Sequence, residues 1–480
     1  MRRFQPGSPP GFFLSRKSPS GLASEKHPPN APIRRRQHAR VGVGRHSDFL
    51  RLSLNGHADI LSHHQGAILM NVVRPSDSPR RTFIDLFSGA GGMTYGFHTH
   101  PSFRVVGAFD GEFGKPSSGK GRLGCNETFR LNIGLSPTPV DLARVEDADI
   151  EAARCDRLGG LDLDVLSACP PCTGFSRANP NNHLDDDERN SLVVRTARWV
   201  RILKPRVLVM ENARELLKGN FAHHFRELRR QLEGMGYDVR ATIHMLDRFG
   251  LPQRRERALV VATRLPIGAK DLEDLWQGFE IDQKATHVRR CIAHLPAVSA
   301  GERHPDDPFH VSPKMNGETR DRIRAIPSDG GSWIDLRDHR DADRLMTPAM
   351  KRYVAAEDFG SHPDVYGRMA WDRPAVTIKR ECAHVGNGRY SHPEQDRLCT
   401  IRELALLQGF PKHYRFGGGS LSNQYRHIGD AVPPLISHQL AHLVDWMFTG
   451  EKPELADCVL PGTRLHAEDI QPAPIQPGRI

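Results

Sequence analysis

The stretch "FIDLFSGAGGMTYGF", residues 83–97, decides the fold, because a short apolar run ends directly in a glycine-rich turn. The run "TFIDLF", residues 82–87, predicts a buried strand. Gly89, Gly91 and Gly92 follow at once, and glycines let a backbone turn tightly and approach a ligand closely. An ordinary turn between a strand and a helix has the same composition, so this stretch alone predicts a turn but does not yet predict a ligand.

Further apolar runs follow the first one and alternate with helical patterns. The runs are "RVVGAFD" (104–110), "LDVLSA" (163–168), "RVLVMEN" (206–212) and "RALVVAT" (257–263), and the helical patterns cover residues 191–205 and 223–237. Strands that alternate with helices predict an α/β fold with a doubly wound, mostly parallel sheet. The ligand site of such a sheet lies at the carboxyl ends of its strands. The notable residues at these predicted ends are Asp85, Phe87, Asp110, Cys172 and Glu211.

The acidic residues near these strand ends indicate the type of ligand. A dinucleotide-binding turn has a third glycine three residues after Gly91, but this position holds Thr94, so the dinucleotide pattern fails. Asp85 lies inside the first strand, Asp110 ends the second, and Asp141 follows "SPTPV". An acid after the second strand commonly accepts hydrogen bonds from ribose hydroxyls. A nucleoside ligand without a pyrophosphate fits this set, and S-adenosylmethionine is the natural candidate.

The sequence Cys-Pro-Pro-Cys, residues 169–172, follows a predicted strand and allows four interpretations. A redox dithiol needs two usable thiols early in a βα unit, and a zinc site needs further ligands that no second CxxC or HxxxH supplies. The other two interpretations are a buried structural turn and a single nucleophilic cysteine. Cys172 is expected at the strand end beside the ligand, whereas Cys169 is expected in the strand as a small buried side chain.

The chain has 480 residues, enough for two or three domains, and its charge is uneven. Residues 1–80 contain 13 basic and 4 acidic residues, while the other 400 contain 54 and 53. The N-terminal segment has no periodic pattern, so we expect it to be disordered and residues 1–69 to be dispensable. It could instead act as a basic arm on nucleic acid, or the natural start could be Met70. Scattered cysteines and the absence of an apolar signal segment predict a reducing compartment.

Six motifs, in the expected order, resemble those of the cytosine-C5 DNA methyltransferases. They are "FIDLFSGAGGMTYGF" (83–97), "PPCTGFSRAN" (170–179), "ENAREL" (211–216), "GLPQRRERALVVAT" (250–263), "TIRELALLQGFP" (400–411) and "HIGDAVPP" (427–434). One such match would be weak evidence, but six matches in order are specific to the family.

The resemblance implies a doubly wound, Rossmann-like S-adenosylmethionine-dependent methyltransferase domain and a smaller, irregular target-recognition domain. The expected segments are a basic N-terminal segment (1–80), the catalytic domain (81–265), the target-recognition domain (266–398), a return to the catalytic domain (399–450) and a loose tail (451–480). The expected activity is methylation of C5 of a flipped cytosine in double-stranded DNA, in restriction–modification or DNA self-marking. We expect a monomer in the bacterial cytoplasm, acting at the nucleoid, with no membrane association. A separately encoded restriction endonuclease is an expected partner.

The resemblance also implies a role for each matched residue. Cys172 would add to C6 of the cytosine, and Glu211 would bind N3 and the exocyclic amine. Arg257 would bind the cytosine carbonyl, and Arg255 would lie near the loop of the nucleophile. The DNA-contacting residues would be Ser176 and Arg177, which would meet backbone phosphates. The cofactor-binding residues would be Asp85, Phe87, Gly89, Gly91, Asp110, Asp141, Leu142, Pro171 and Asp430, and no metal is expected.

Three positions depart from the family pattern. Ala213 replaces the usual valine, Asp430 replaces the usual asparagine, and an insertion with glycines and lysines separates Asp110 from Asn126. We expect Asp110 rather than Glu112 to meet the ribose. Two other functions stay open: an RNA methyltransferase that uses the same chemistry on tRNA, and a non-catalytic relative that binds cofactor or DNA. The long irregular segment favours DNA over RNA, and the intact catalytic residues argue against a non-catalytic protein.

Overall fold

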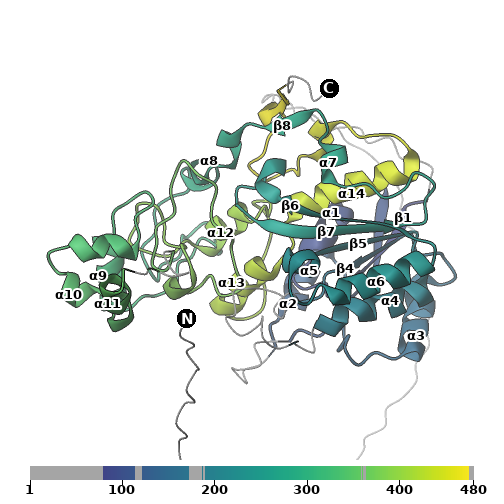
Figure 1. Ribbon diagram of the computed structural model, residues 1–480, viewed down its shortest axis with the longest axis horizontal. Coiled ribbons are helices and arrows are strands. Elements are labelled where there is room, and N and C mark those ends of the chain that lie inside the picture. Colours follow the sequence, from purple (N-terminus) through teal and green to yellow (C-terminus); the bar gives the residue numbers. More distant parts are fainter. Residues whose placement is uncertain are drawn as a thin grey trace, which may run out of the picture. The chain divides into compact units, whose positions relative to one another are not determined.

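A computed structural model gives the fold of the chain (Figure 1). It describes residues 79–113, 122–171, 186, 190–357, 359 and 364–474. Residues 75–480 form one compact unit. Within the described ranges, no helix combines the length and the apolar character that crossing a bilayer requires.

A central sheet organises the compact unit. Its strands lie in the order β3 (Thr138–Pro139), β2 (Phe103–Asp110), β1 (Arg81–Leu86), β4 (Val165–Ala168), β5 (Val207–Ala213), β7 (Glu256–Thr263) and β6 (Asp238–Met245). The first five strands of this order pair in parallel, while β7 pairs antiparallel with both of its neighbours. The predicted doubly wound, mostly parallel α/β sheet is therefore confirmed, and the reversed strand β7 is an addition to the prediction.

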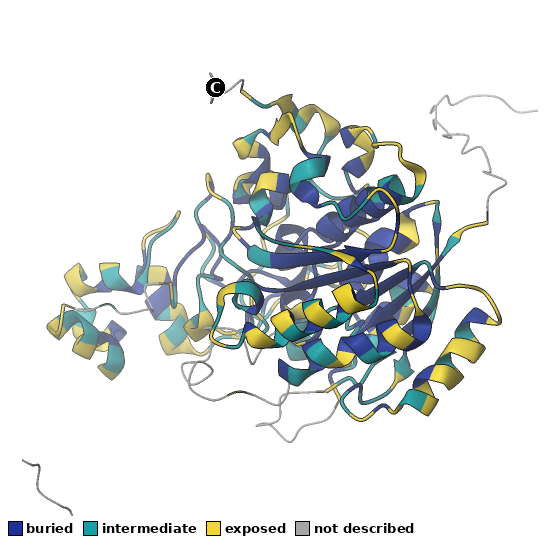
Figure 2. Cartoon of the chain, turned by 45° about the vertical axis from the view of Figure 1, so that its right-hand side comes forward, coloured by how far each residue is buried: buried dark blue, intermediate teal, exposed yellow. Residues whose placement is uncertain are grey.

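Helices cover both faces of this sheet (Figure 1). One face carries α1 (Gly92–Thr99), α2 (Cys125–Ile133) and α14 (Pro434–Thr449), and the other carries α3 (Asp147–Leu158), α4 (Ser191–Leu203), α5 (Glu215–Lys218) and α6 (His223–Gly234). Side chains alternate along a strand, so Phe83 joins the first apolar core and Ile84 joins the second. Figure 2 shows the resulting pattern, in which the strands are buried and the outer helices expose one side.

A close contact between α1 and α14 joins two helices that lie far apart in the sequence. At Gly96 an added Cβ would lie 2.2 Å from the backbone of Ser437, so only glycine fits there. The Ser437 hydroxyl donates to the Gly92 carbonyl at 2.8 Å and accepts from the Gly96 N–H at 3.1 Å. The glycines that follow β1 therefore seat the last long helix as well as forming the turn.

The segment between β7 and the last helices contains short elements. They are α7 (Leu272–Leu275), β8 (Phe279–Ile281), α8 (Val288–Ile292), α9 (Gly317–Ala325), α10 (Ala342–Leu345), α11 (Pro348–Ala355), α12 (Ile401–Leu407) and α13 (Leu421–Asp430). Helices α9 to α11 have an apolar cluster of their own around Trp333 and Leu336, whereas Trp371 and Ile378 belong to the larger core. The boundaries 266–398 of a separate recognition domain stay a prediction.

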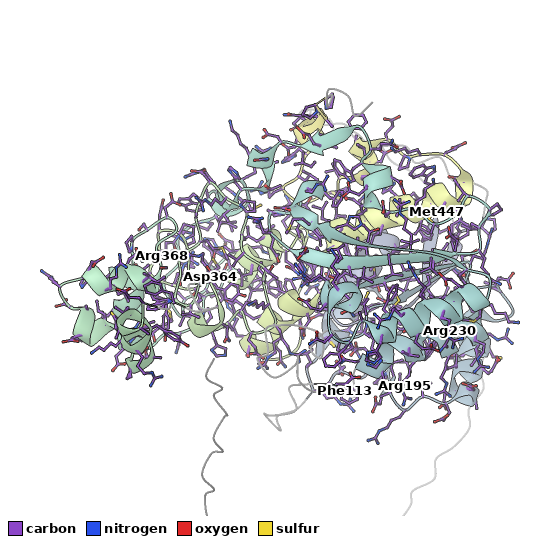
Figure 3. The ribbon with its side chains drawn as sticks, in the orientation of Figure 1. Phe113, Arg195, Arg230, Asp364, Arg368 and Met447 are labelled. Atoms are coloured by element: carbon purple, nitrogen blue, oxygen red, sulfur yellow. The ribbon has the colours of Figure 1, made fainter. Side chains whose placement is uncertain are left out.

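Arg368 links the end of α9 to the chain near Asp396. Its side chain is only 1% exposed and donates to the carbonyls of Ile323 and Ile326 and to Asp396. Figure 3 labels Arg368 beside Asp364 in the lobe that contains α9 to α11. A buried guanidinium is tolerated here because these carbonyl and carboxylate groups receive its donors.

The structure corrects the expectation of a loose tail for residues 451–474. Strand β9 (Ile470–Pro472) pairs antiparallel with β8, so this part of the chain is ordered. The side chains of Leu460 and Leu465 are buried in the larger core. These apolar residues are unevenly spaced, which explains why no helical or strand period indicated them.

Three histidines pack together where α1 meets α14. The ring centroids of His100 and His442 are 4.3 Å apart, and those of His438 and His442 are 4.7 Å apart. Burial lowers the pKa of His100 to about 4 and the pKa of His442 to about 3. The pKa of His438 is lowered by the same cause. The cluster is therefore neutral in the folded protein at pH 7.

We predict that this cluster destabilises the fold in acid. A histidine with a lowered folded pKa contributes its full stability above about pH 6.5, and that stability is lost as the pH falls below this value, because the unfolded chain then binds more protons. The melting temperature of the wild type should therefore fall more between pH 7 and pH 5 than that of His442→Gln. Equal falls in the two proteins, measured by differential scanning calorimetry, would contradict the prediction.

Candidate active site

The turn after β1 holds its shape through left-handed backbone angles. Phe87, Gly89 and Gly91 have φ angles of 59°, 50° and 90°. Phe87 is unusual, because a bulky residue with positive φ is strained, and such strain is found most often at functional sites. The Tyr414 hydroxyl donates to the Ala90 carbonyl at 2.5 Å and fixes the turn from the far end of the chain.

Asp110 at the end of β2 supports the same turn. One carboxylate oxygen accepts from the Gly89 N–H at 2.9 Å, and the other accepts from the Glu112 N–H at 2.6 Å. Each oxygen of a carboxylate has two lone-pair sites. Oδ1 also accepts from the Cys125 thiol at 3.5 Å, so Oδ2, which accepts from Gly89, is the oxygen that keeps an acceptor site for a ligand hydroxyl. Glu112 accepts instead from the Asn126 N–H at the start of α2. The choice of Asp110 for the ribose stays a prediction, and this geometry is compatible with it.

Asp85 lies inside β1 and is almost fully buried. It accepts a 2.5 Å hydrogen bond from the Thr94 hydroxyl on α1. Burial raises the pKa of Asp85 to about 7, although hydrogen bonds from Thr94 and Ser167 oppose the rise. Thr94 was the residue that excluded the dinucleotide pattern, and its role as the partner of Asp85 could not be read from the sequence.

Asp141 and Leu142 follow β3 at the edge of the sheet. Asp141 accepts from the Ala143 N–H at 3.0 Å and lies 3.3 Å from Arg144, while Leu142 is buried. A cavity of about 480 Å³ opens beside Asp141, and its wall includes Phe109 and Trp199. The structure thus places Asp141 at a partly apolar recess.

Cys169 and Pro170 lead into the predicted nucleophile segment, and β5 holds both. The Sγ atom of Cys169 accepts from the Glu211 N–H at 3.4 Å, and burial raises the pKa of Cys169 well above its usual value. The Asn212 amide donates to the Pro170 carbonyl at 3.0 Å. A protonated thiol is a poor nucleophile, so Cys169 is unsuited to that role.

Four predicted site residues differ in how much the structure says of them. Pro171 is the last described residue of its segment and is exposed. Cys172, Ser176 and Arg177 lie outside the described residues. Asn212, which fixes the approach to Pro171, was quoted within the motif "ENAREL" but received no predicted role.

Glu211 and Arg257 meet at the end of the sheet. Glu211 lies near the end of β5 with 8% of its surface exposed, and its Oε1 atom lies 2.9 Å from Nε of Arg257 at the start of β7. This contact is an ion pair and not an aligned hydrogen bond, because among the described residues Oε1 receives no directed donor. The buried carboxylate oxygen therefore keeps acceptor capacity for a ligand.

Arg255 and Gln253 form a second, structural layer next to this pair. Arg255 lies 3.9 Å from Glu211 and donates to the carbonyls of Ile378 and Ala431. Gln253 accepts from the Ile378 N–H and donates to Gln408 at 2.5 Å. The side chains before β7 thus join the irregular segment around Ile378 and the last motif to the sheet.

Asp430 ends α13 and forms an ion pair with Arg380 at 2.6 Å. The side chain of Asp430 is 35% exposed. The surrounding protein raises the pKa of Asp430 to about 6 by desolvation, although Arg380 opposes the rise. Sequence reasoning named Asp430 but missed Arg380, which lies fifty residues earlier.

Within the described ranges, the one group of side chains that could hold a metal ion contains Asp186, His223 and His224. It lies at the N-terminus of α6 and includes no cysteine. The Asp186 carboxylate is already hydrogen-bonded to His224 and Asn190. This group therefore lends no support to a zinc site at Cys169.

Comparisons with known proteins give the family. The model of the C-5 cytosine-specific DNA methylase family matches residues 81–444. Type II methylase M.HgiDII of Herpetosiphon aurantiacus is 28% identical over 371 residues, which are 76% of this chain and 96% of the relative. Type II methyltransferase M.NgoFVII of Neisseria gonorrhoeae is 32% identical over 368 residues, 75% of this chain and 85% of the relative.

A solved structure shares the fold. It is a protein from E. coli, described as a DNA modification methyltransferase encoded within a prophage, and it superposes with a TM-score of 0.52 at 19% identity. The similarity covers 77% of this chain and all of the other. Because the family model matches from the first strand to the last long helix, the chain belongs to the C-5 cytosine-specific DNA methylases, enzymes that transfer a methyl group from S-adenosylmethionine to C5 of cytosine.

Proposed function

We propose that the chain methylates C5 of a flipped cytosine in double-stranded DNA through a covalent bond between Cys172 and C6. The observation that carries this proposal is the contact of Glu211 with Arg257 at 2.9 Å, beside the fixed segment that leads to Cys172. An acid and a cation at one edge of the sheet can bind the polar edge of one cytosine. The relatives named above as type II methylases or methyltransferases support a DNA substrate.

The residues at the ends of β1 and β2 fit S-adenosylmethionine. The left-handed turn at Phe87, Gly89 and Gly91 brings backbone close to a ligand, and Oδ2 of Asp110 keeps an acceptor site for a ribose hydroxyl. The failed dinucleotide pattern at Thr94 agrees with a nucleoside that has no pyrophosphate. When bound, S-adenosylmethionine supplies the methyl group and leaves as S-adenosylhomocysteine.

In the proposed reaction the Cys172 thiolate adds to C6, which makes C6 tetrahedral, breaks the C5–C6 double bond and leaves an electron-rich enamine at C4 and C5. Glu211 binds N3 and the exocyclic amine and shares a proton with the ring, so the negative charge does not build up on the base. Arg257 binds the carbonyl at C2. After C5 has accepted the methyl group, loss of the C5 proton and of the thiolate restores the aromatic ring.

Strand β5 also supports the reaction through two contacts that do not involve the base. Asn212 fixes the Pro170 carbonyl and so sets the direction in which the chain reaches Cys172. The Glu211 N–H points at the Cys169 sulfur, which keeps the first cysteine occupied as an acceptor. We place Ser176 and Arg177 at DNA phosphates, where contacts position the duplex and do not read its sequence.

We further propose a role in restriction–modification or DNA self-marking in the bacterial cytoplasm. The two relatives named above are bacterial type II enzymes, which supports this role. A separately encoded endonuclease would be the partner, and the enzyme would act as a monomer. An RNA substrate is the second candidate, because the covalent chemistry is the same on tRNA. Residues 266–398 favour DNA, since they provide a long segment for reading a duplex.

Sequencing after bisulfite treatment tests the substrate. The purified protein is incubated with S-adenosylmethionine and either plasmid DNA or bulk tRNA. We expect methylcytosine at one short recurring sequence in the plasmid and none above background in the tRNA. Methylation of tRNA alone would replace the DNA proposal with the RNA one, and methylation of neither would contradict both.

We predict that Glu211→Gln lowers the turnover number by at least about a hundredfold, because a glutamine cannot share a proton with the ring. The matched control is Glu256→Gln. Glu256 is the first residue of β7, next to Arg257. It forms a 2.6 Å ion pair with Arg214 but has no proposed contact with the base. Methyl transfer is measured with a tritiated cofactor under saturating DNA. Equal losses in both variants would remove Glu211 from the mechanism.

We also predict that Cys172, and not Cys169, forms the bond to DNA. DNA with 5-fluorocytosine at the target should trap a covalent complex, because fluorine at C5 cannot leave as a proton. Cys172→Ser should abolish the trapped band, since a hydroxyl is far less ionised than a thiol. Cys169→Ala should keep the band with a modest loss of stability. The opposite pattern on a denaturing gel would overturn the assignment.

A further inference from the structure

The ion pair between Arg380 and Asp430 lies where this sequence departs from the family pattern. Asp430 stands in the last motif, where the family pattern has a neutral asparagine. Arg380 lies 2.6 Å from this carboxylate and is its counter-ion. Arg380 comes from the irregular segment after β7 and not from the sheet. The pair therefore joins two parts of the chain that are fifty residues apart in the sequence.

Arg380 also reaches the loop that follows β2. Its second terminal nitrogen lies 3.5 Å from the carbonyl of Phe113, three residues after Asp110. Phe113 is the last described residue of that loop, and Figure 3 labels it at the lower border of the sheet region. One guanidinium therefore contacts the end of α13 and Phe113, which follows the proposed ribose acid by three residues.

The backbone around Arg380 is packed against α13. At Gly429 an added Cβ would lie 2.2 Å from the Lys379 carbonyl, so helix and segment touch without an intervening side chain. The Cys382 thiol lies 3.5 Å from the Tyr425 carbonyl of the same helix. The position of Arg380 is thus fixed by its neighbours, which makes it suitable for holding a loop.

Several charges act on Asp430. They come from the irregular segment, from the residues before β7 and from the end of β2, and they are Arg380, Glu381, Arg255 and Asp110. Two of these are acids, so an unpaired carboxylate at residue 430 would repel Asp110 as well as lose solvation. Arg380 offsets both effects.

We propose that Arg380 is a positioning residue that latches residues 111–113, which follow β2, to the last motif, so that a seated recognition segment is required for tight cofactor binding. This inference rests on the proposed function, because it assumes that S-adenosylmethionine binds beside Asp110. In this arrangement a neutral residue at position 430 needs no counter-ion, whereas an aspartate there needs the positive charge of Arg380. Binding of cofactor and seating of the segment around residue 380 then favour each other.

Calorimetric titration with S-adenosylmethionine and with S-adenosylhomocysteine tests the latch. Arg380→Met should weaken the binding of both by about tenfold, the effect of losing one charge-assisted contact. The KM for the cofactor should rise by a similar factor, with a smaller change in kcat. The double variant Arg380→Met/Asp430→Asn should bind more tightly than Arg380→Met, because the unpaired charge is gone.

The pH dependence separates a latch from a general loss of structure. In Arg380→Met the affinity should fall as the pH rises from 6 to 8, because Asp430 then ionises without a counter-ion. The wild type and the double variant should show no such fall. Arg426→Met is the matched control, since it removes the 3.3 Å ion pair of Arg426 with Glu381, which also involves α13 but does not contact Phe113. The affinity of this variant should stay within about twofold of the wild type.

Three outcomes would overturn the latch. They are unchanged affinity in Arg380→Met, a loss confined to S-adenosylmethionine, which would indicate an effect on the sulfonium charge alone, and an equal loss in Arg426→Met. Arg380→Lys keeps the charge and serves if Arg380→Met does not melt cooperatively; it should retain the flat pH profile. If the wild type binds neither cofactor form, the proposed function fails, and this result is distinct from failure of the latch.

Discussion

The contact between Glu211 and Arg257 depends on one reversal of strand direction, and the rest of the site is arranged around it. A parallel sheet offers only the last residues of its strands at the ligand edge. Because β7 runs antiparallel to β5, its first residues lie at that same edge, and Arg257 stands opposite Ala213, two residues beyond Glu211. A cation from the beginning of one strand thereby meets an acid from the end of another. A fully parallel sheet could not make this pair from these strands.

The residues just before β7 extend the effect of the reversal to the rest of the chain. Gln253 and Arg255 are buried, and a buried polar group without a partner costs about 1–3 kcal/mol. Their partners are the backbone of Ile378, the carbonyl of Ala431 and the side chain of Gln408. The irregular segment and the last motif can satisfy these groups in one arrangement only. Hydrogen bonding therefore specifies how the parts around the cleft dock, while the apolar core supplies the driving force.

The sequence predicts what is local and misses what is not. Asp85, Asp110 and Glu211 could be placed at one edge because each ends an apolar run, and strand ends of an α/β sheet gather together. The bond from Gly89 to Asp110 and the pair of Arg380 with Asp430 join residues far apart in sequence, and no period indicates them. The ordered residues 451–474 escaped for a related reason: their buried leucines are irregularly spaced. The role of Cys172 rests on the motif and the chemistry of its neighbours.

The two cysteines of Cys-Pro-Pro-Cys illustrate how one motif can specify another. Strand β5 contributes the Glu211 N–H to the sulfur of Cys169 and the Asn212 amide to the carbonyl of Pro170. The first contact belongs to a thiol whose raised pKa keeps it protonated, and the second fixes the backbone one residue before Pro171. The prolines fix φ at both intervening positions, so the direction toward residue 172 is constrained from two sides. The Glu-Asn pair thus combines a proposed catalytic acid with the group that aims the proposed nucleophile, which explains in physical terms why the two residues are needed side by side.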